Sequence, residues 1–60
     1  MLYEIWSDFG SDNQNCHAVT DNISSAERFF NLAKDAVMGT VSVMVFVPGT
    51  DDVLYELDFE

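Results

Sequence analysis

The last ten residues, DDVLYELDFE, concentrate five carboxylates and contain no Lys or Arg. These acids are Asp51, Asp52, Glu56, Asp58 and Glu60. Read with a period of two, the segment is an extended strand that directs Glu56, Asp58 and Glu60 to one face and apolar side chains to the other. Carboxylates two residues apart on a strand repeat every ~6.8 Å. A row of this kind attracts cations or a protein surface rich in Lys and Arg.

Cys16 and His17 are the other neighbours whose residue types could do chemistry. A structural zinc site usually needs four ligands, and the chain has one Cys and one His. A nucleophilic Cys needs a base oriented across a pocket, which an adjacent residue rarely provides. We therefore expect a loop Cys and a loop His, with no metal, no cofactor and no enzyme activity.

The segment DFGSDNQNCHAVTD offers oxygen donors that could hold a calcium ion. The donors are Asp8, Asp12, Asn13, Asn15 and Asp21. They lack the ordered spacing of a calcium loop and the Glu at its twelfth position. A calcium-responsive module built on residues 8–22 is therefore kept as the third of three functional hypotheses.

The composition indicates one small folded domain with an unbalanced charge. The 60 residues include eleven Asp and Glu but two Lys and Arg, for a net charge of −9. Because 48% of the residues are hydrophobic, with five Phe, the chain can fill a small core, unlike a disordered acidic tail. Direct binding to nucleic acid or to an anionic membrane would add like-charge repulsion. The expected partner is basic.

Compartment and membrane signals are few. A lone Cys16 excludes an internal disulfide, and MLYEIWSDFG lacks the basic and apolar regions of a signal peptide. The longest apolar run, VMVFV, is far too short to cross a bilayer. These features predict a cytoplasmic protein.

Four segments carry clear secondary-structure signals. We expect strands at 2–9, 41–47 and 53–59, a helix at 24–39, and a long loop from 10 to 22. Ser24 or Ser25 would cap the helix, and Gly39 would end it in a left-handed conformation. One apolar stripe would face the sheet, formed by Ala26, Phe29, Phe30, Ala33 and Val37.

These elements predict an α+β fold over residues 1–60, with βαββ order and one helix on one face of a three-stranded mixed sheet. A right-handed crossover would make strands 2–9 and 41–47 parallel. The turn at 48–52 would make 53–59 antiparallel to 41–47. The order of the strands is left open, although the apolar side chains on both faces of 41–47 favour a central position.

The charges separate sharply along the chain. The helix holds both basic residues and two of the carboxylates, so nine carboxylates and no Lys or Arg lie outside it. If Val53, Tyr55, Leu57 and Phe59 pack under the helix, the acids of that strand face away from it. Glu4 and Asp8 share one parity and would join them, with Asp51 and Asp52 at one end of that face.

The same face is expected to carry an apolar band rimmed by acids. Its members are Leu2, Trp6, Met44, Phe46 and Leu54. Aromatic side chains are enriched at interface hot spots, so Trp6 joins the candidate partner-binding residues. A dimer interface or a covering loop would account equally well for this band, although a monomer is favoured.

The acidic row suggests an imitation of nucleic-acid phosphates, which rise ~3.4 Å per nucleotide along one DNA strand and lie further apart in space. Three alternating charges alone would more simply be the solvated side of an amphipathic strand. The absence of Lys and Arg from all predicted strands and loops favours mimicry for the chain as a whole, because ordinary surfaces mix both signs.

In its length, its excess of Asp and Glu and its acidic end DDVLYELDFE, the chain resembles the small DNA-mimicking inhibitors of phages and other mobile elements, such as anti-CRISPR proteins. The resemblance implies a stoichiometric inhibitor of a Cas effector that blocks a DNA-binding channel. No residue role is carried over, since acidic mimics share charge placement rather than sequence. The alternative is a small interaction subunit or adaptor that binds through the apolar band, with its charge serving solubility.

Overall fold

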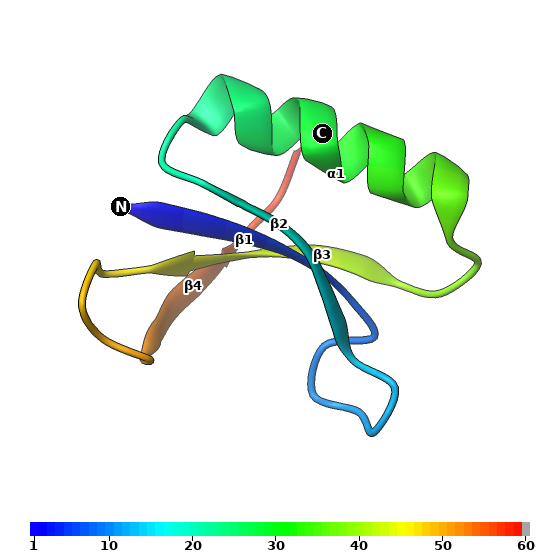
Figure 1. Ribbon diagram of the computed structural model, residues 1–60, viewed down its shortest axis with the longest axis horizontal. Helices are drawn as coiled ribbons and strands as arrows, with labels where there is room; N and C mark the ends of the chain where they lie inside the picture. The colour runs from blue at the N-terminus through cyan, green and yellow to red at the C-terminus, as the bar shows by residue number, and fades with distance from the viewer. Residues whose placement is uncertain (60) are drawn as a thin grey trace.

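The computed structural model describes residues 1–59 and shows one helix packed on one face of an antiparallel sheet (Figure 1). The elements in order are β1 (Leu2–Ser7), β2 (Asn15–Thr20), α1 (Ile23–Ala36), β3 (Val41–Phe46) and β4 (Val53–Leu57). The sheet has the order β2-β1-β3-β4, and each neighbouring pair is antiparallel. The α+β class is confirmed. The three-stranded mixed sheet with βαββ order is wrong.

The missing strand is β2, which lies within the predicted loop at 10–22. Its sequence, NCHAVT, begins with polar residues, and only Ala18 and Thr20 are partly buried. As an edge strand, it needs few apolar side chains. The regular alternation is also broken by a bulge, because Ile5 pairs with Ala18 but Trp6 pairs with Cys16.

The predicted parallel pairing of the first strand with 41–47 is also wrong. β1 and β3 are antiparallel, with Leu2 opposite Phe46 and Ser7 opposite Val41. The helix connects β2 to β3, and these two strands lie on either side of β1 and run in the same direction. The crossover rule was therefore applied to the wrong pair of strands. The central position of β3 and its hairpin with β4 are confirmed.

Both ends of α1 differ from the prediction. Asn22, not Ser24 or Ser25, caps the helix, and its side chain accepts a hydrogen bond from the Ser25 N–H at 3.0 Å. At the other end, Val37 is extended and its N–H donates to the Ala33 carbonyl. Gly39 has no positive φ, so it is not a left-handed cap.

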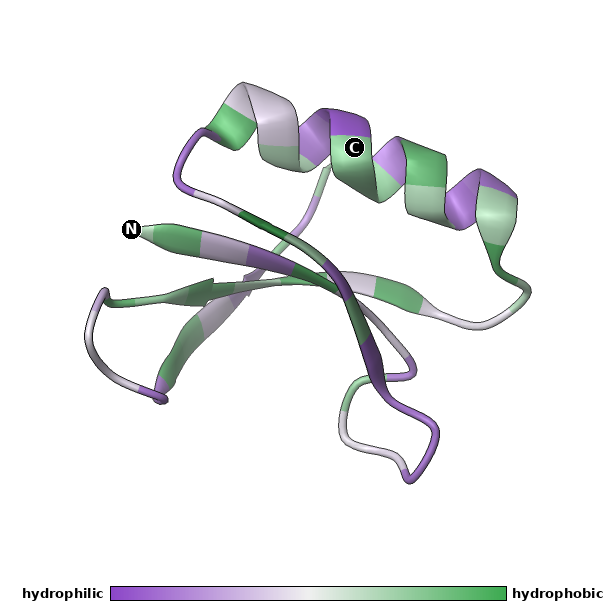
Figure 2. Ribbon diagram, in the orientation of Figure 1, coloured by the Kyte–Doolittle hydropathy of each residue, from purple (hydrophilic) through white to green (hydrophobic). Residues whose placement is uncertain are grey.

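The core lies between α1 and the central strands. Ile5 and Val43 are fully buried and pack with Ala26 and Ala33 of the helix. The two small alanines allow the helix to approach the sheet closely. The predicted apolar stripe is confirmed as the sheet-facing side of the helix except for Val37, which lies beyond its end. Figure 2 shows this pattern as alternating hydrophobic and hydrophilic bands along α1 above a mostly hydrophobic β3.

The helix lies against β1, β2 and β3, but within residues 1–59 it does not lie over β4 (Figure 1). β4 begins at a turn far from the helix, and the chain then runs toward α1, where Phe59 packs on Phe30 with ring centroids 5.6 Å apart (Figure 1). Leu57 and Phe59 are partly buried as predicted, whereas Val53 and Tyr55 are exposed and do not pack under the helix. β4 is therefore held mainly by its pairing with β3.

Candidate functional site

Two carboxylates flank a methionine on the face of the sheet opposite α1, here called the helix-free face. Glu4 of β1 and Glu56 of β4 both lie opposite Met44 of β3. Ile5, Val43 and Leu57, one residue along each strand, contribute to the core beneath the helix, so this row points the other way. Two strand spacings separate the Cα atoms of the two glutamates, about 10 Å. The sheet thus brings together two acids that are far apart in sequence.

Trp6 holds the Glu4 side chain in place. Its indole Nε1–H donates to Oε1 of Glu4 at 2.9 Å, and both residues are partly buried. The Trp6 ring also meets Phe9 edge to face, with centroids 5.2 Å apart. The Glu4 carboxylate is therefore oriented by an anchored aromatic ring, whereas Glu56 is exposed on the edge strand.

The remaining acids of the C-terminal segment lie around this row. Asp51 and Asp52 are exposed in the turn between β3 and β4, and Asp58 is exposed directly after β4. Asp58 follows the last residue of β4, so the alternation along the strand does not place it on the face of Glu56. Glu60 lies outside the described residues.

Asp8 does not belong to this face. β1 ends at Ser7, and Asp8 has a left-handed φ of 51°, which breaks the alternation that placed it beside Glu4. Its N–H donates to the Thr40 carbonyl at 2.8 Å, and its Oδ1 accepts from the Thr40 N–H at 3.2 Å. Asp8 thus joins the loop after β1 to the segment before β3, which is a structural role.

The apolar band is much less exposed than predicted. Met44 and Phe46 are each only 7% exposed, and Leu2 and Trp6 are partly buried. Of the five residues, Leu54 alone is in the exposed class. The helix-free face therefore presents carboxylates beside a largely covered apolar centre.

Cys16 and His17 lie on β2 and not in a loop. Partial burial, and secondarily the negative charge of Glu4, raise the pKa of the Cys16 thiol, against a smaller opposing effect of hydrogen bonding with the Ala18 backbone. A raised pKa makes the thiol a poor nucleophile at neutral pH. His17 is the extra residue of the bulge, and its Nε2 shares a 2.8 Å hydrogen bond with the buried Ser7 hydroxyl.

The calcium hypothesis loses its donor set. Asp12 lies in the turn between β1 and β2, and Asp21 follows the far end of β2. The six residues of β2 separate them by roughly 20 Å, far beyond the reach of one coordination sphere. Within residues 1–59, no group of three or more His, Cys, Asp or Glu side chains could hold a metal ion.

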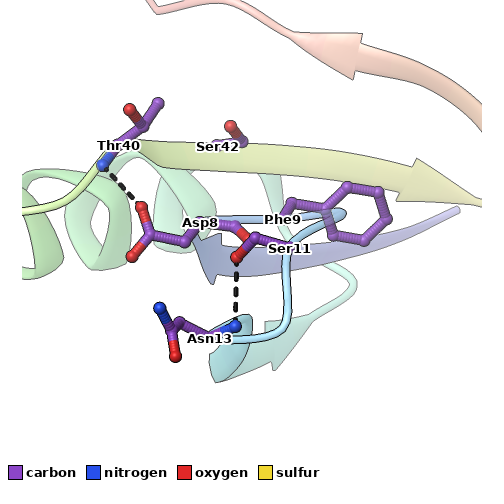
Figure 3. A pocket seen from close by; sticks show the side chains of 6 residues that line it. All are labelled: Asp8, Phe9, Ser11, Asn13, Thr40 and Ser42. Atoms are coloured by element: carbon purple, nitrogen blue, oxygen red, sulfur yellow. Dashed lines mark hydrogen bonds between the residues drawn. The ribbon is translucent and has the colours of Figure 1, made fainter.

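A shallow hollow at the Asp8 end of the sheet was not predicted from the sequence. It has a volume of about 480 Å³ and is lined by Asp8, Phe9, Ser11, Asn13, Thr40 and Ser42 (Figure 3). The side chains come from two segments, 8–13 and 40–42, that are well separated in sequence, so no local motif signals it. Two of its polar side chains already bond within the protein, as Asp8 does to the Thr40 N–H and Ser11 does to the Asn13 N–H.

Comparison of the chain with protein-family models, with curated proteins and with solved structures finds no match. In residues 1–59, α1 is also too short and too polar to traverse a lipid bilayer. The arrangement of the side chains is therefore the basis for any functional assignment.

Proposed function

We propose that this protein is a non-enzymatic acidic inhibitor that imitates nucleic-acid phosphates and blocks the DNA-binding surface of a host defence complex, such as a Cas effector. The observation that carries the proposal is the pair Glu4 and Glu56, held on one face of the sheet with no Lys or Arg on any strand or loop. A basic nucleic-acid-binding protein is the partner that such a face fits.

The carboxylates form an array in two directions, as phosphates do. Glu4 and Glu56 are about 10 Å apart across the strands, and Glu56 and Asp58 are ~6.8 Å apart along the extended chain. Asp51 and Asp52 add charge at the turn. Like charges on one surface reinforce one another's potential, which accelerates association with a basic partner at low ionic strength.

The two bases support the proposal by their position. Arg28 and Lys34 are exposed on α1, which covers the other face of the sheet, and the Lys34 ammonium lies 5.0 Å from the centroid of the Phe30 ring. The molecule therefore has a negative sheet face and a helix on which charges of both signs balance. This asymmetry orients the sheet face toward a basic groove.

A pair of double variants tests the proposal. The double variant Glu4→Gln, Glu56→Gln removes two charges from the helix-free face. It keeps a side-chain oxygen at position 4 that can accept the Trp6 hydrogen bond. The double variant Glu27→Gln, Asp35→Asn removes two charges from exposed positions on α1 and serves as the control. Both are assayed for inhibition of target-DNA cleavage by guide-loaded Cas effectors.

The face variant should lose roughly tenfold or more in inhibitory potency, because charge pairs at an interface are lost. The helix control should inhibit as the unmodified protein does. Equal potency of all three proteins would show that the helix-free face is not the mimic.

A second candidate function is supported by three exposed apolar residues on β4. Val53, Leu54 and Tyr55 are 41%, 47% and 51% exposed. They favour a small interaction subunit or adaptor whose charge serves solubility. Binding through such a surface should change little with salt, whereas binding through the acids should weaken steeply.

A further inference from the structure

The outer edge of β4 is an unpaired strand edge. β4 is the last strand of the sheet, with β3 on one side and no strand on the other among residues 1–59. An unpaired edge presents backbone N–H and C=O groups that can pair with another extended chain. The helix does not cover β4, and Val53, Leu54 and Tyr55 are exposed, although Leu57 packs against the core.

The side chains of β4 restrict what can pair with this edge. Glu56 is on the helix-free face with Asp58 beyond it, and Tyr55 is on the opposite face, across from Val45. A strand added beside β4 would place its own side chains next to these, about 5 Å away between Cβ atoms. The complementary strand therefore alternates basic and apolar residues.

A second copy of this chain does not satisfy that requirement. Pairing β4 with β4 would bring together two acidic segments, each with Asp51, Asp52, Glu56 and Asp58 and no base. Like charges placed opposite each other destabilise a strand pair. The register shift at Phe46, where Val53 takes the place of Leu54, further limits regular pairing to Tyr55–Leu57.

We propose that β4 receives an extended basic segment of the partner protein as a fifth strand of the sheet, with Lys or Arg beside Glu56 and an apolar side chain beside Tyr55. This inference rests on the proposed function, since it assumes a basic partner, and it specifies the way in which that partner is bound. Backbone hydrogen bonds supply the affinity, and the acids select the sequence.

The test uses a seven-residue peptide in which Lys and Val alternate. Its control has the same sequence with the three central amides N-methylated. This change keeps the charge and removes backbone N–H donors from both edges of the peptide. Amide hydrogen exchange is followed at β4 and at β2, the other edge of the same sheet.

At a peptide concentration roughly ten times the dissociation constant, exchange of the outward-facing amides of Val53–Leu57 should slow about tenfold. The N-methylated peptide should leave their exchange unchanged, and exchange in β2 should not respond to either peptide. The inference is overturned if β4 gains no protection, if both peptides protect it equally, or if β2 is protected to the same degree.

The two proposals can fail separately. If the Glu4 and Glu56 variant loses inhibition but the peptide protects nothing in β4, phosphate imitation stands and strand addition falls. If the peptide protects β4 but the protein inhibits no guide-loaded effector, the edge site stands and the proposed function falls.

Discussion

Asp8 and Thr40 are joined by two hydrogen bonds that run in opposite directions. The Asp8 N–H donates to the Thr40 carbonyl at 2.8 Å, and the Thr40 N–H donates to Oδ1 of Asp8 at 3.2 Å. Asp8 adopts a left-handed φ of 51°, which Asp and Asn tolerate better than most residues. The pair fixes the end of β1 against the start of β3.

Replacing Asp8→Ala should lower the free energy of unfolding by about 2–3 kcal/mol, because it removes the acceptor and leaves Ala in the left-handed region. Asp8→Asn keeps both features and should cost less than about 1 kcal/mol. Urea unfolding followed by tryptophan fluorescence measures both values. If both variants lost the same free energy of unfolding, the Thr40 hydrogen bond and the left-handed conformation at position 8 would not contribute to stability.

Gly39 is required by the closeness of this same carboxylate. A Cβ added at position 39 would lie 2.5 Å from Oδ1 of Asp8, so Gly39→Ala forces this carboxylate to move away from the Thr40 N–H. We expect a loss of about 1–3 kcal/mol. In the Asp8→Ala background the same change should cost clearly less, because the obstructing atoms are gone. Additive losses in this double-mutant cycle would contradict the proposed steric conflict.

The charge of Glu4 can be read from the reactivity of Cys16. Glu4 is one of the causes that raise the pKa of this thiol, after burial, so Glu4→Gln should lower that pKa and speed alkylation by iodoacetamide at pH 8. Glu56→Gln is the matched control and should leave the alkylation rate unchanged, since Glu56 is on β4 and Cys16 is on β2, at opposite edges of the sheet. A rate that does not respond to Glu4→Gln would place the two side chains further apart.

The same raised pKa has a consequence for stability at alkaline pH. The unfolded thiol ionises near its ordinary value of 9.0, whereas the folded state resists ionisation. The stabilising contribution is therefore complete below pH 9 and is lost as the pH rises through the folded pKa. In urea titrations between pH 8 and 10.5, Cys16→Ser should show a smaller fall in stability than the unmodified protein.

Repulsion among the carboxylates should oppose folding. With a net charge of −9, raising the salt concentration at pH 7 should raise the Tm. The double variant Glu56→Gln, Asp58→Asn should have a Tm that is higher by roughly 2–4 °C at low salt and that depends less on salt. The helix control, Glu27→Gln with Asp35→Asn, should gain less, because Arg28 and Lys34 already offset those charges. A lower Tm for the strand variant would show that these acids stabilise the fold.

The sequence predicted the elements whose apolar periodicity is strong. The stripe from Ala26 to Ala33 identified the helix and its buried side, and the β-branched run at 41–47 identified a central strand. β2 was missed because an edge strand with a bulge at His17 needs no regular apolar alternation. Without β2, the crossover was assigned to the wrong strands.

The candidate site was predicted in part for the same reason. The shared face of Glu4 and Glu56 was predicted because both strands were correctly located in the sequence and side chains alternate along each of them, although the direction of β1 relative to β3 was wrong. Asp8 was misplaced because the strand ends one residue earlier, and a left-handed residue cannot be read from alternation. The exposure of Tyr55 also escaped prediction, since nothing local to β4 reveals that the helix stops short of it.

Phosphate imitation by the helix-free face can be tested by displacement of labelled duplex DNA from a guide-loaded Cas effector, measured across a salt series. A phosphate mimic should displace the duplex at a ratio near one to one, and its apparent affinity for the effector should fall steeply as salt rises. The double variant Glu4→Gln, Glu56→Gln should displace the duplex less well, whereas the double variant Glu27→Gln, Asp35→Asn should displace it as the unmodified protein does. Displacement that is independent of salt, or that the helix pair weakens equally, would contradict a phosphate-like sheet face.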